Sequence, residues 1–141
     1  MLLIGVLGFM FWQKSQVKTL APVVESTIKK VDLATQPIWV QNLKVSAKKG
    51  RSANGLDNLT LSVNGIEAIS LTYVLQYQTS NKGAQGALAM TPQKITGNIF
   101  TKVIDLGTCS TKSCVRHDGV TSVDVELDFN DSSVWTGTVS L

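Results

Sequence analysis

The stretch ISLTYVLQYQ, residues 69–78, carries an apolar or aromatic side chain at every second position. Successive side chains of a β-strand point to opposite faces, so these four share one face: Leu71, Tyr73, Leu75 and Tyr77. The intervening positions are half polar, which is typical of a face that meets water or an edge element. The pattern predicts a central core strand, around which the rest of the domain is organised.

Length and composition favour one compact, β-rich domain with an appendage. The chain has 141 residues, of which 43% are hydrophobic and 16% charged. It is therefore too apolar for a disordered chain and too poor in charge for a long, solvated helix bundle. One hydrophobic core fits this length.

The net charge of +3 is distributed unevenly along the chain. Residues 1–51 contain eight Lys or Arg and two acids, whereas residues 52–141 contain five and eight. Aromatic residues make up only 6% and are not interleaved with basic ones, so no nucleic-acid platform is indicated. A basic stem near an anionic lipid surface is the better interpretation.

The chain opens with LLIGVLGFMFW, residues 2–12, an apolar run that would reach roughly 16 Å as a helix. That is about half of a ~30 Å hydrocarbon core. Trp12 followed by Lys14 and Lys18 resembles the collar that ends a membrane segment. We expect a signal-anchor that contacts lipid through residues 1–18 and whose first residues precede this sequence. The alternatives are a buried core helix and the apolar region of a signal peptide.

The orientation of this anchor is a separate question. Positive charge lies only after the apolar run, and the positive-inside rule would then keep the following domain in the cytoplasm. An upstream basic region would reverse that expectation.

Residues 13–34 change to a helical period, with Val17, Leu20, Val24, Ile28 and Val31 along one side. This predicts a stem helix, interrupted near Pro22. The residue before a proline avoids helical backbone angles, so the Pro37 segment should end the stem. We therefore divide the chain into an anchor and stem, 1–36, and a β-domain, 37–141.

The β-domain should contain seven strands separated by turn clusters. Their expected ranges are 38–46, 59–63, 69–79, 86–90, 99–106, 120–129 and 134–141. Asn64-Gly65 is a strong tight-turn dipeptide. In the 120–129 strand, Val123, Val125, Leu127 and Phe129 alternate with acids, which predicts one core face and one acidic face. Seven such strands without helices between them indicate an antiparallel β-sandwich.

Three of these strands carry a family resemblance. NLKV at 42–45, LTLSV at 59–63 and YVLQY at 73–77 resemble the first three strands of a fibronectin type III or immunoglobulin-like domain. Val63 stands where fibronectin type III modules usually have tryptophan. The resemblance implies adhesion, spacing or ligand binding. In overall plan, an apolar N-terminal helix before a β-rich head also resembles type IV pilin-like subunits, although Gly5 stands where their motif has glutamate.

Candidate chemistry is sparse. His117 is the only histidine, so a catalytic arrangement would have to use it with Cys114 or Asp118. Its polar neighbours predict instead a solvated surface histidine. Cys109, Cys114 and His117 lack the fourth ligand and the spacing of a structural zinc site. No enzyme activity, cofactor or metal is therefore expected.

Two further motifs depend on context. The acids at 124, 126 and 128 alternate along a strand and would point outward in a line rather than converge on calcium. Asn58 and Asn130 begin N-glycosylation sequons.

The segment LGTCSTKSCVRHDG, residues 106–119, predicts a disulfide-braced loop. Four small or polar residues separate Cys109 from Cys114, and such a segment turns readily. Opposed residues near a hairpin end can meet the geometry of a disulfide, and an even cysteine count beside a membrane-targeting start favours oxidation. The alternative is two free thiols in a reduced compartment. The brace would place Lys112, Arg116 and His117 on one basic protrusion, our candidate contact surface.

These observations together predict a membrane-tethered, extracytoplasmic β-sandwich with a non-catalytic role in adhesion, structure or assembly. Its partner would be another protein or further copies of itself. The alternative is a filament subunit whose N-terminal helix packs in a polymer core. Two structural expectations follow: one buried cluster should contain Tyr73, Leu75, Leu127, Phe129 and Trp135. The head should also fold without residues 1–36.

Overall fold

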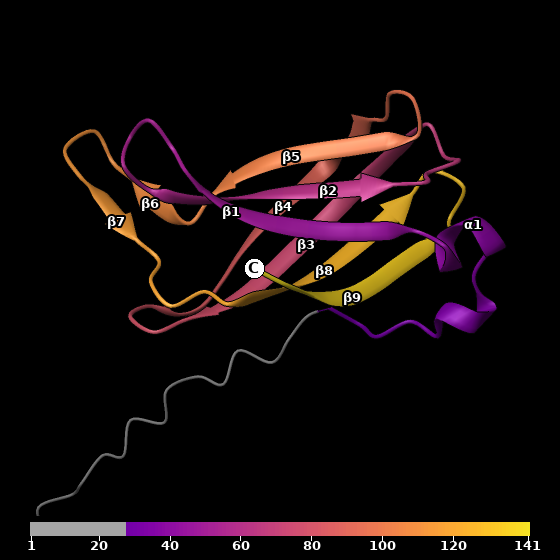
Figure 1. Cartoon of the computed structure of the whole chain (residues 1–141), viewed down its shortest axis with the longest axis horizontal. Helices are drawn as coiled ribbons and strands as arrows, with labels where there is room; N and C mark the ends of the chain where they lie inside the picture. The colour runs from indigo at the N-terminus through magenta and orange to yellow at the C-terminus, as the bar shows by residue number, and fades with distance from the viewer. Residues whose placement is uncertain (1–27) are drawn as a thin grey trace, which may run out of the picture.

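The computed structural model describes residues 28–141, which form a mainly β body with two short helical turns at its start (Figure 1). The elements are η1 Leu33–Thr35, α1 Ile38–Gln41, β1 Lys44–Arg51, β2 Asp57–Asn64, β3 Ser70–Thr79, β4 Gly83–Lys94, β5 Ile99–Asp105, β6 Gly107–Cys109, β7 Cys114–Arg116, β8 Ser122–Phe129 and β9 Val134–Ser140. The predicted anchor at 2–12 lies outside the described residues. Within residues 28–141, no helix has the length and apolar character needed to cross a membrane.

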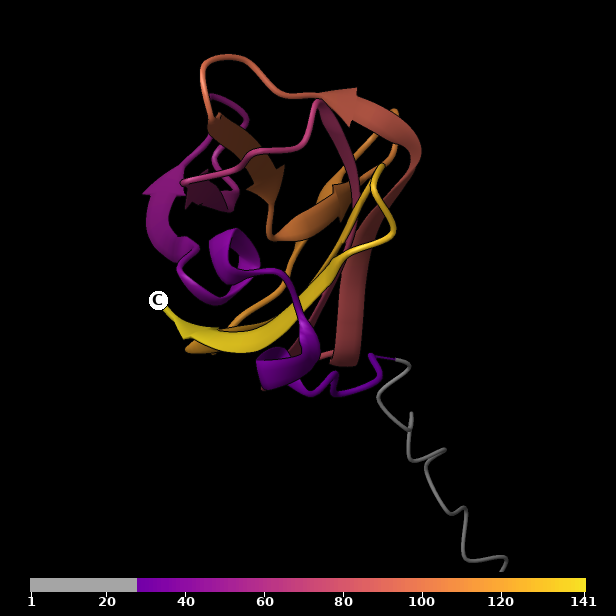
Figure 2. The same cartoon turned by 90° about the vertical axis from the view of Figure 1, so that its right-hand side faces the viewer.

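Seven strands form two antiparallel sheets that face each other across the core (Figures 1 and 2). One sheet has the order β1-β2-β5 and the other β4-β3-β8-β9. β3 pairs with β4 on one side and β8 on the other, which confirms the central position predicted for the 69–78 stretch. β6 and β7 pair only with each other, as a hairpin at one end of the molecule.

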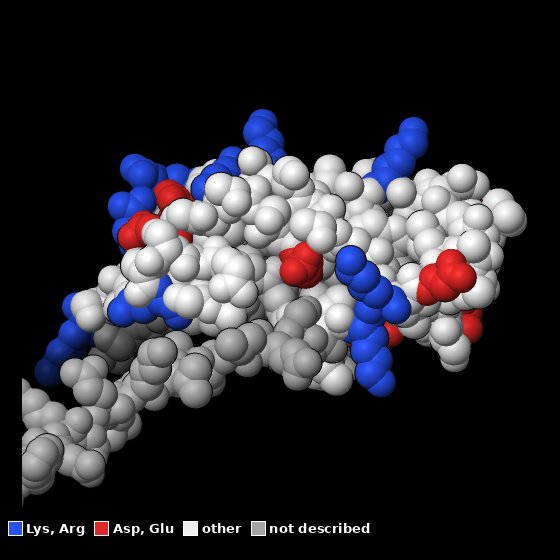
Figure 3. Space-filling model, turned by 90° about the horizontal axis from the view of Figure 1, so that it is seen from below, with Lys and Arg blue, Asp and Glu red and all other residues white. Residues whose placement is uncertain are grey.

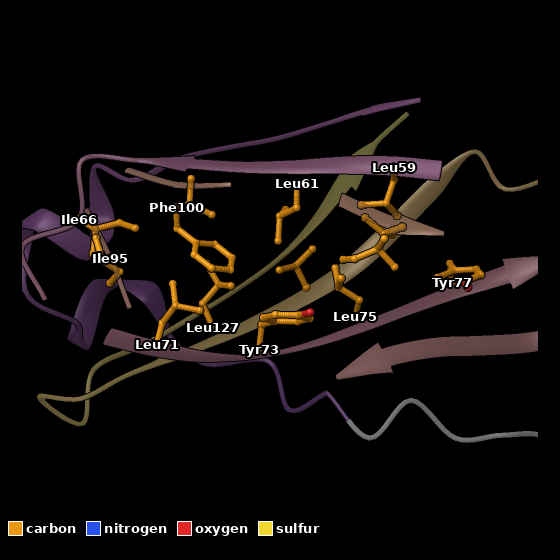
Figure 4. Packing of buried hydrophobic residues seen from close by; sticks show 14 of the residues in the cluster. Leu59, Leu61, Ile66, Leu71, Tyr73, Leu75, Tyr77, Ile95, Phe100 and Leu127 are labelled. Carbon is orange, nitrogen blue, oxygen red and sulfur yellow. The ribbon is translucent and has the colours of Figure 1, made fainter. Parts of the chain in front are cut away.

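The core fills the space between the two sheets. Leu59 and Leu61 of β2 point toward Tyr73 and Leu75 of β3 (Figure 4), and all four are at most 4% exposed. Tyr73 also packs on Phe100 of β5, with ring centroids 6.0 Å apart. The predicted core faces are confirmed, because the alternating apolar residues of β3 and β8 all belong to one buried cluster.

Trp135 is the exception in the predicted cluster, because it is only partly buried against it. It lies on β9, the edge strand of its sheet, opposite Leu127. Its indole passes over Gly137: a Cβ added to that glycine would lie 2.6 Å from the ring. The large ring therefore covers the margin of the core rather than filling its centre.

The first predicted strand, 38–46, is wrong over its first half. Residues Ile38–Gln41 form the single turn of α1 after Pro37, and β1 starts only at Lys44. The turn is held by packing: Val40 is fully buried, and Trp39 meets Phe129 edge-on at a centroid distance of 4.8 Å. Closing the end of the core with these side chains outweighs the strand propensity of the local sequence.

Asn64-Gly65 does not close a hairpin, because β2 pairs with β1 and β5 and not with β3. Gly65 has the positive φ of 89° that the dipeptide suggests. The amides of Gly65 and Ile66 both donate to the carbonyl of Asn98, each at 3.1 Å. The dipeptide therefore turns the chain from one sheet to the other.

The described residues contain nine strands rather than the predicted seven. The two additional strands, β6 and β7, are three residues each and come from the cysteine segment, for which the sequence predicts a loop. β4 is also longer than predicted, at 12 residues, because its pairing with β3 extends beyond the apolar 86–90 run.

Residues 28–36, the described part of the stem, contain only the 3-10 turn η1, so the predicted helix is wrong in this part. The segment instead contacts β9. The Val31 amide donates to Thr136 Oγ1 at 3.1 Å, and Gln36 Oε1 accepts from the Val134 amide at 2.8 Å. Burial raises the pKa of Glu126, as does the nearby Asp128, whereas a hydrogen bond from the Lys29 backbone acts in the opposite direction.

Because residues 28–36 contact β9, chains truncated to start at residue 28 or at residue 37 should differ in stability. A chain starting at residue 28 should unfold with the same free energy as the full chain. A chain starting at residue 37 should lose about 1–2 kcal/mol, because two hydrogen bonds to β9 disappear. Urea denaturation of both truncations measures the difference, and equal stability of the two would show that residues 28–36 contribute nothing to the fold.

Candidate functional site

Several connections meet at one end of the molecule, where the β6–β7 hairpin projects (Figure 1). They are the β1–β2 turn at 52–56, the β3–β4 turn at 80–82 and the segment 106–121 between β5 and β8. Loops placed at one end of a rigid sandwich are a common position for binding sites. We call this surface the loop end.

The hairpin is regular and tightly closed. Cys109 lies opposite Cys114, and the four loop residues between them are closed by the amide of Ser110 donating to the carbonyl of Ser113 at 2.8 Å. Ser110 Oγ also accepts from the amides of Lys112 and Ser113, at 3.4 and 3.3 Å. The Ser110 side chain therefore stabilises the turn at the tip of the hairpin.

The cysteine sulfurs lie 1.97 Å apart, the distance of a disulfide bond, and the two Cα atoms are 4.0 Å apart. The sulfurs of the predicted disulfide thus lie within bonding distance, across directly opposed strand residues. The loop it closes is short, so on the chain-entropy estimate it stabilises the fold by only roughly 2 kcal/mol. Its main effect is to restrict the conformations of an exposed hairpin.

The base of the hairpin packs closely on the β1–β2 turn. A Cβ added to Gly107 would lie 2.6 Å from the carbonyl oxygen of Val115 and 3.0 Å from Leu56 Cδ2. Beside it, the Leu106 amide donates to the backbone carbonyl of Asp57 at 2.7 Å, and the His117 amide donates to the carbonyl of Leu106 at 3.0 Å. The hairpin therefore leaves the core at a fixed position.

Arg116 is at this base rather than at the tip, and it is paired. Its Nη2 lies 3.1 Å from Asp57 Oδ1, and Arg51 Nη2 lies 3.6 Å from the same oxygen. All three side chains are at least one-third exposed, so the cluster stabilises the fold only modestly. Its effect is to hold Arg116 against the body of the domain.

His117 is buried, so its predicted position on the surface is wrong. The residue is 6% exposed, and its Nδ1 lies 3.0 Å from Tyr77 Oη. The chain turns from the hairpin back to the core at this residue, where Tyr77 ends the core face of β3. Burial raises the pKa of the Tyr77 phenol. A buried tyrosine hydroxyl usually has a hydrogen-bond partner. The position of Tyr77 at the end of an apolar strand face was therefore the only sign in the sequence that a polar side chain lies beside it.

Replacing Tyr77 with phenylalanine should lower the free energy of unfolding by about 1–2 kcal/mol, because it leaves a buried imidazole nitrogen without its partner. Tyr73→Phe is the matched control, since Tyr73 forms no hydrogen bond through its hydroxyl to another described residue. Chemical denaturation at pH 7 compares the two. Equal losses in the two variants would mean that the hydrogen bond between Tyr77 and His117 does not contribute to the stability of the fold.

Asn81 connects the β3–β4 turn to the segment after the hairpin, and it was not recognised from the sequence. Its Nδ2 donates to the Arg116 carbonyl at 3.0 Å and to Asp118 Oδ2 at 2.9 Å. Its Oδ1 accepts from the Asp118 amide at 3.1 Å. Asparagine in a turn cluster was the only signal, and it does not identify a partner 37 residues away.

The β1–β2 turn is attached to the end of β5 in a similar way. Ser52 Oγ donates to Asp105 Oδ1, and Asn54 Nδ2 lies 3.4 Å from Asp105 Oδ2. Asn58 Nδ2 donates to Ser52 Oγ at 3.1 Å. Side-chain hydrogen bonds therefore link each of the three connections to a neighbouring element.

The predicted contact residues do not form one basic protrusion. Lys112 is exposed at the tip, Arg116 is paired at the base, and His117 belongs to the core. Figure 3 shows basic and acidic side chains side by side at the hairpin end of the molecule, on its left in that view. The surface is therefore mixed in charge, and Lys112 is one of its exposed cations.

Within residues 28–141, no group of three His, Cys, Asp or Glu side chains is arranged to hold a metal ion. The acids of β8 line up on the outer face of their sheet, and Asp124 accepts a hydrogen bond from Thr138 Oγ1 at 2.6 Å. Of the two sequon asparagines, Asn58 is 9% exposed, whereas Asn130 is exposed in the β8–β9 turn.

The chain was compared with protein-family models, with curated proteins and with solved structures, and none of the three comparisons found a match.

Proposed function

We propose that this protein is a membrane-tethered, extracytoplasmic β-sandwich with a non-catalytic role in adhesion or assembly. The observation that supports it best is the pair Cys109 and Cys114, at bonding distance on an exposed hairpin. Exposed disulfides persist in oxidising compartments and are rare in the cytosol. The apolar run at 2–12 provides the tether in this proposal.

We also propose that the sandwich is immunoglobulin-like, and the strand order supports this. With the hairpin left aside, the third, sixth and seventh long strands share a sheet, as strands C, F and G do in immunoglobulin domains. The first, second and fifth form the other sheet, as A, B and E do. The fourth strand, β4, pairs with the third rather than with the fifth, which distinguishes this order from the constant-domain arrangement.

The loop end is the surface that we assign to partner contact. A binding surface gains affinity when its loops are ordered before the partner arrives, since less conformational entropy is then lost. Here the disulfide restricts the tip of the hairpin, and close packing around Gly107 restricts its base. The hydrogen bond from Asn81 to Arg116 holds the adjoining β3–β4 turn. Lys112, at the hairpin tip, is an exposed charge that a partner can contact. A protein surface with acidic and neutral polar groups is the kind of partner that fits.

The filament subunit is the second candidate, and it rests on the same N-terminal run. In a filament the apolar residues would be buried against copies of themselves rather than in lipid. The two candidates share the β-domain and differ only in what surrounds residues 2–12.

Membrane extraction tests the proposal. The full chain should remain with membranes after an alkaline carbonate wash and enter small micelles in mild detergent, whereas a chain starting at residue 28 should be recovered in the wash. A filament subunit would instead pellet as a polymer that withstands the detergent. Recovery of the full chain in the wash would contradict both candidates.

Two charge-reversal variants test the proposed role of the loop end in binding. Lys112→Glu should reduce attachment of the protein to its native surface or assembly, with no change in the free energy of unfolding. Lys48→Glu is the matched control, because Lys48 is an exposed lysine in the middle of β1, away from the loop end. Equal effects of the two variants would show that total charge, not the loop end, determines attachment.

A further inference from the structure

β4 is a long strand at the open edge of the four-stranded sheet. It has 12 residues and pairs with β3 on one side only among the described residues. The opposite edge, β9, is partly covered, because Val31 binds Thr136 and β1 packs nearby. The backbone N–H and C=O groups along the outer side of β4 can therefore accept another strand.

Most of β4, residues 83–90, lacks the features that usually protect an edge strand. No charged residue occurs between Gly83 and Gln93, and Leu88 and Met90 are 64% and 71% exposed. Natural edges commonly carry lysine, proline or a bulge that prevents pairing. Here the irregularity lies only toward one end: the register shifts between Ala89 and Gln93, a stretch that contains Pro92. Residues 83–89 keep a regular register with β3 and carry no charge.

A groove of about 400 Å³ lies beside this edge, on the outer face of the sheet. Its lining includes Val74, Ala84, Gly86 and Leu88. Gly86 contributes no side chain, so the surface is low there, and Leu88 stands next to it as an exposed projection. Projection and groove are two residues apart on the same face of one strand.

We propose that β4 pairs antiparallel with β4 of a second copy of this chain, around a two-fold axis at Ala87. Residues equally far from Ala87 then face each other, so Leu88 of each copy lies opposite Gly86 of the second copy and enters its groove. Met90 lies opposite Ala84. The two four-stranded sheets become one continuous sheet, and large side chains oppose small ones throughout the contact.

The charge pattern favours a second copy over a foreign strand. Antiparallel self-pairing brings each residue near the axis close to its own symmetry copy, so any charge there would lie near a charge of the same sign. β4 has none from residue 83 to residue 93. An edge built for a partner of different sequence has no need of this restriction. One strand pair is a small interface, so the dimer should be weak, with a Kd in roughly the micromolar range.

The test uses the full chain in excess detergent and does not depend on where the protein is located. Sedimentation should show a monomer–dimer equilibrium, and amide exchange of residues 84–90 should slow as protein concentration rises. Leu88→Lys should weaken the dimer by about 100-fold, because both copies lose a buried leucine. Val103→Lys is the matched control, since Val103 is 55% exposed on β5, the edge of the other sheet.

Mixing two variants tests the symmetry. Positions 88 of the two copies are diagonal neighbours, ~7–8 Å apart. An equal mixture of Leu88→Lys and Leu88→Glu should therefore recover dimers that neither variant forms alone. A wild-type chain that stays monomeric, an association that survives Leu88→Lys, or a mixture that behaves like either variant alone would each overturn the proposed pairing.

Discussion

Leu127→Ala should lower the free energy of unfolding by roughly 2–5 kcal/mol, because it removes a fully buried side chain from the centre of the core. Leu127 lies in β8 opposite Tyr73, where the sheet packs against β2 and β5. Neighbours on both sheets cannot move together without breaking strand pairing, so the cavity should remain largely open. Urea denaturation followed by tryptophan fluorescence measures the loss.

Leu88→Ala is the control for this change, since it removes the same atoms from an exposed position. It should alter stability by less than about 0.5 kcal/mol in the monomer. Comparable losses in the two variants would mean that the assignment of core and outer faces is wrong.

Gly107→Ala should lower the free energy of unfolding by roughly 1–3 kcal/mol, although it adds only one methyl group. The new Cβ would lie 2.6 Å from a backbone oxygen, and backbone at a paired strand cannot shift as a flexible side chain can. The hairpin should move away from the β1–β2 turn, and the contact between Arg116 and Asp57 should weaken with it.

Thr108→Ala is the neighbouring control, because Thr108 is exposed in the same strand. Amide exchange in residues 106–117 should accelerate in Gly107→Ala and not in Thr108→Ala. Unchanged exchange in both variants would show that the hairpin base is not held by close packing at Gly107.

The core strands could be predicted because their pattern repeats along the sequence itself. In β3 and β8 the apolar residues alternate without interruption, and each strand has neighbours on both sides. In such strands the period of two fixes the face, since a shift of one residue would expose every apolar side chain. Local pattern and tertiary environment agree there.

The errors occur where tertiary contacts decide the conformation. α1 forms because Trp39 and Val40 close the end of the core, a demand that the local sequence does not reveal. Asn64-Gly65 has the conformation typical of a turn but connects different sheets, because partner choice is not encoded in the dipeptide. Residues 28–36 follow hydrogen bonds to β9, more than 90 residues later.

The candidate site shows the same division. Cys109 and Cys114 could be paired from the sequence because they are close neighbours with a turn-forming segment between them. His117 could not be placed, since its partner Tyr77 is 40 residues away and its own neighbours are polar. Asn81 and Asp57 were missed for the same reason: each acts through contacts that are distant in sequence.

The oxidation state of the two cysteines in protein isolated from its native source tests the extracytoplasmic assignment most directly. Intact mass is measured after alkylation under denaturing, non-reducing conditions, and again after reduction. The structure places the sulfurs at bonding distance, so we predict that no label is added before reduction and that two are added after it. Two labels before reduction would show free thiols, and would contradict both the disulfide-braced hairpin and the oxidising compartment that the proposed function requires.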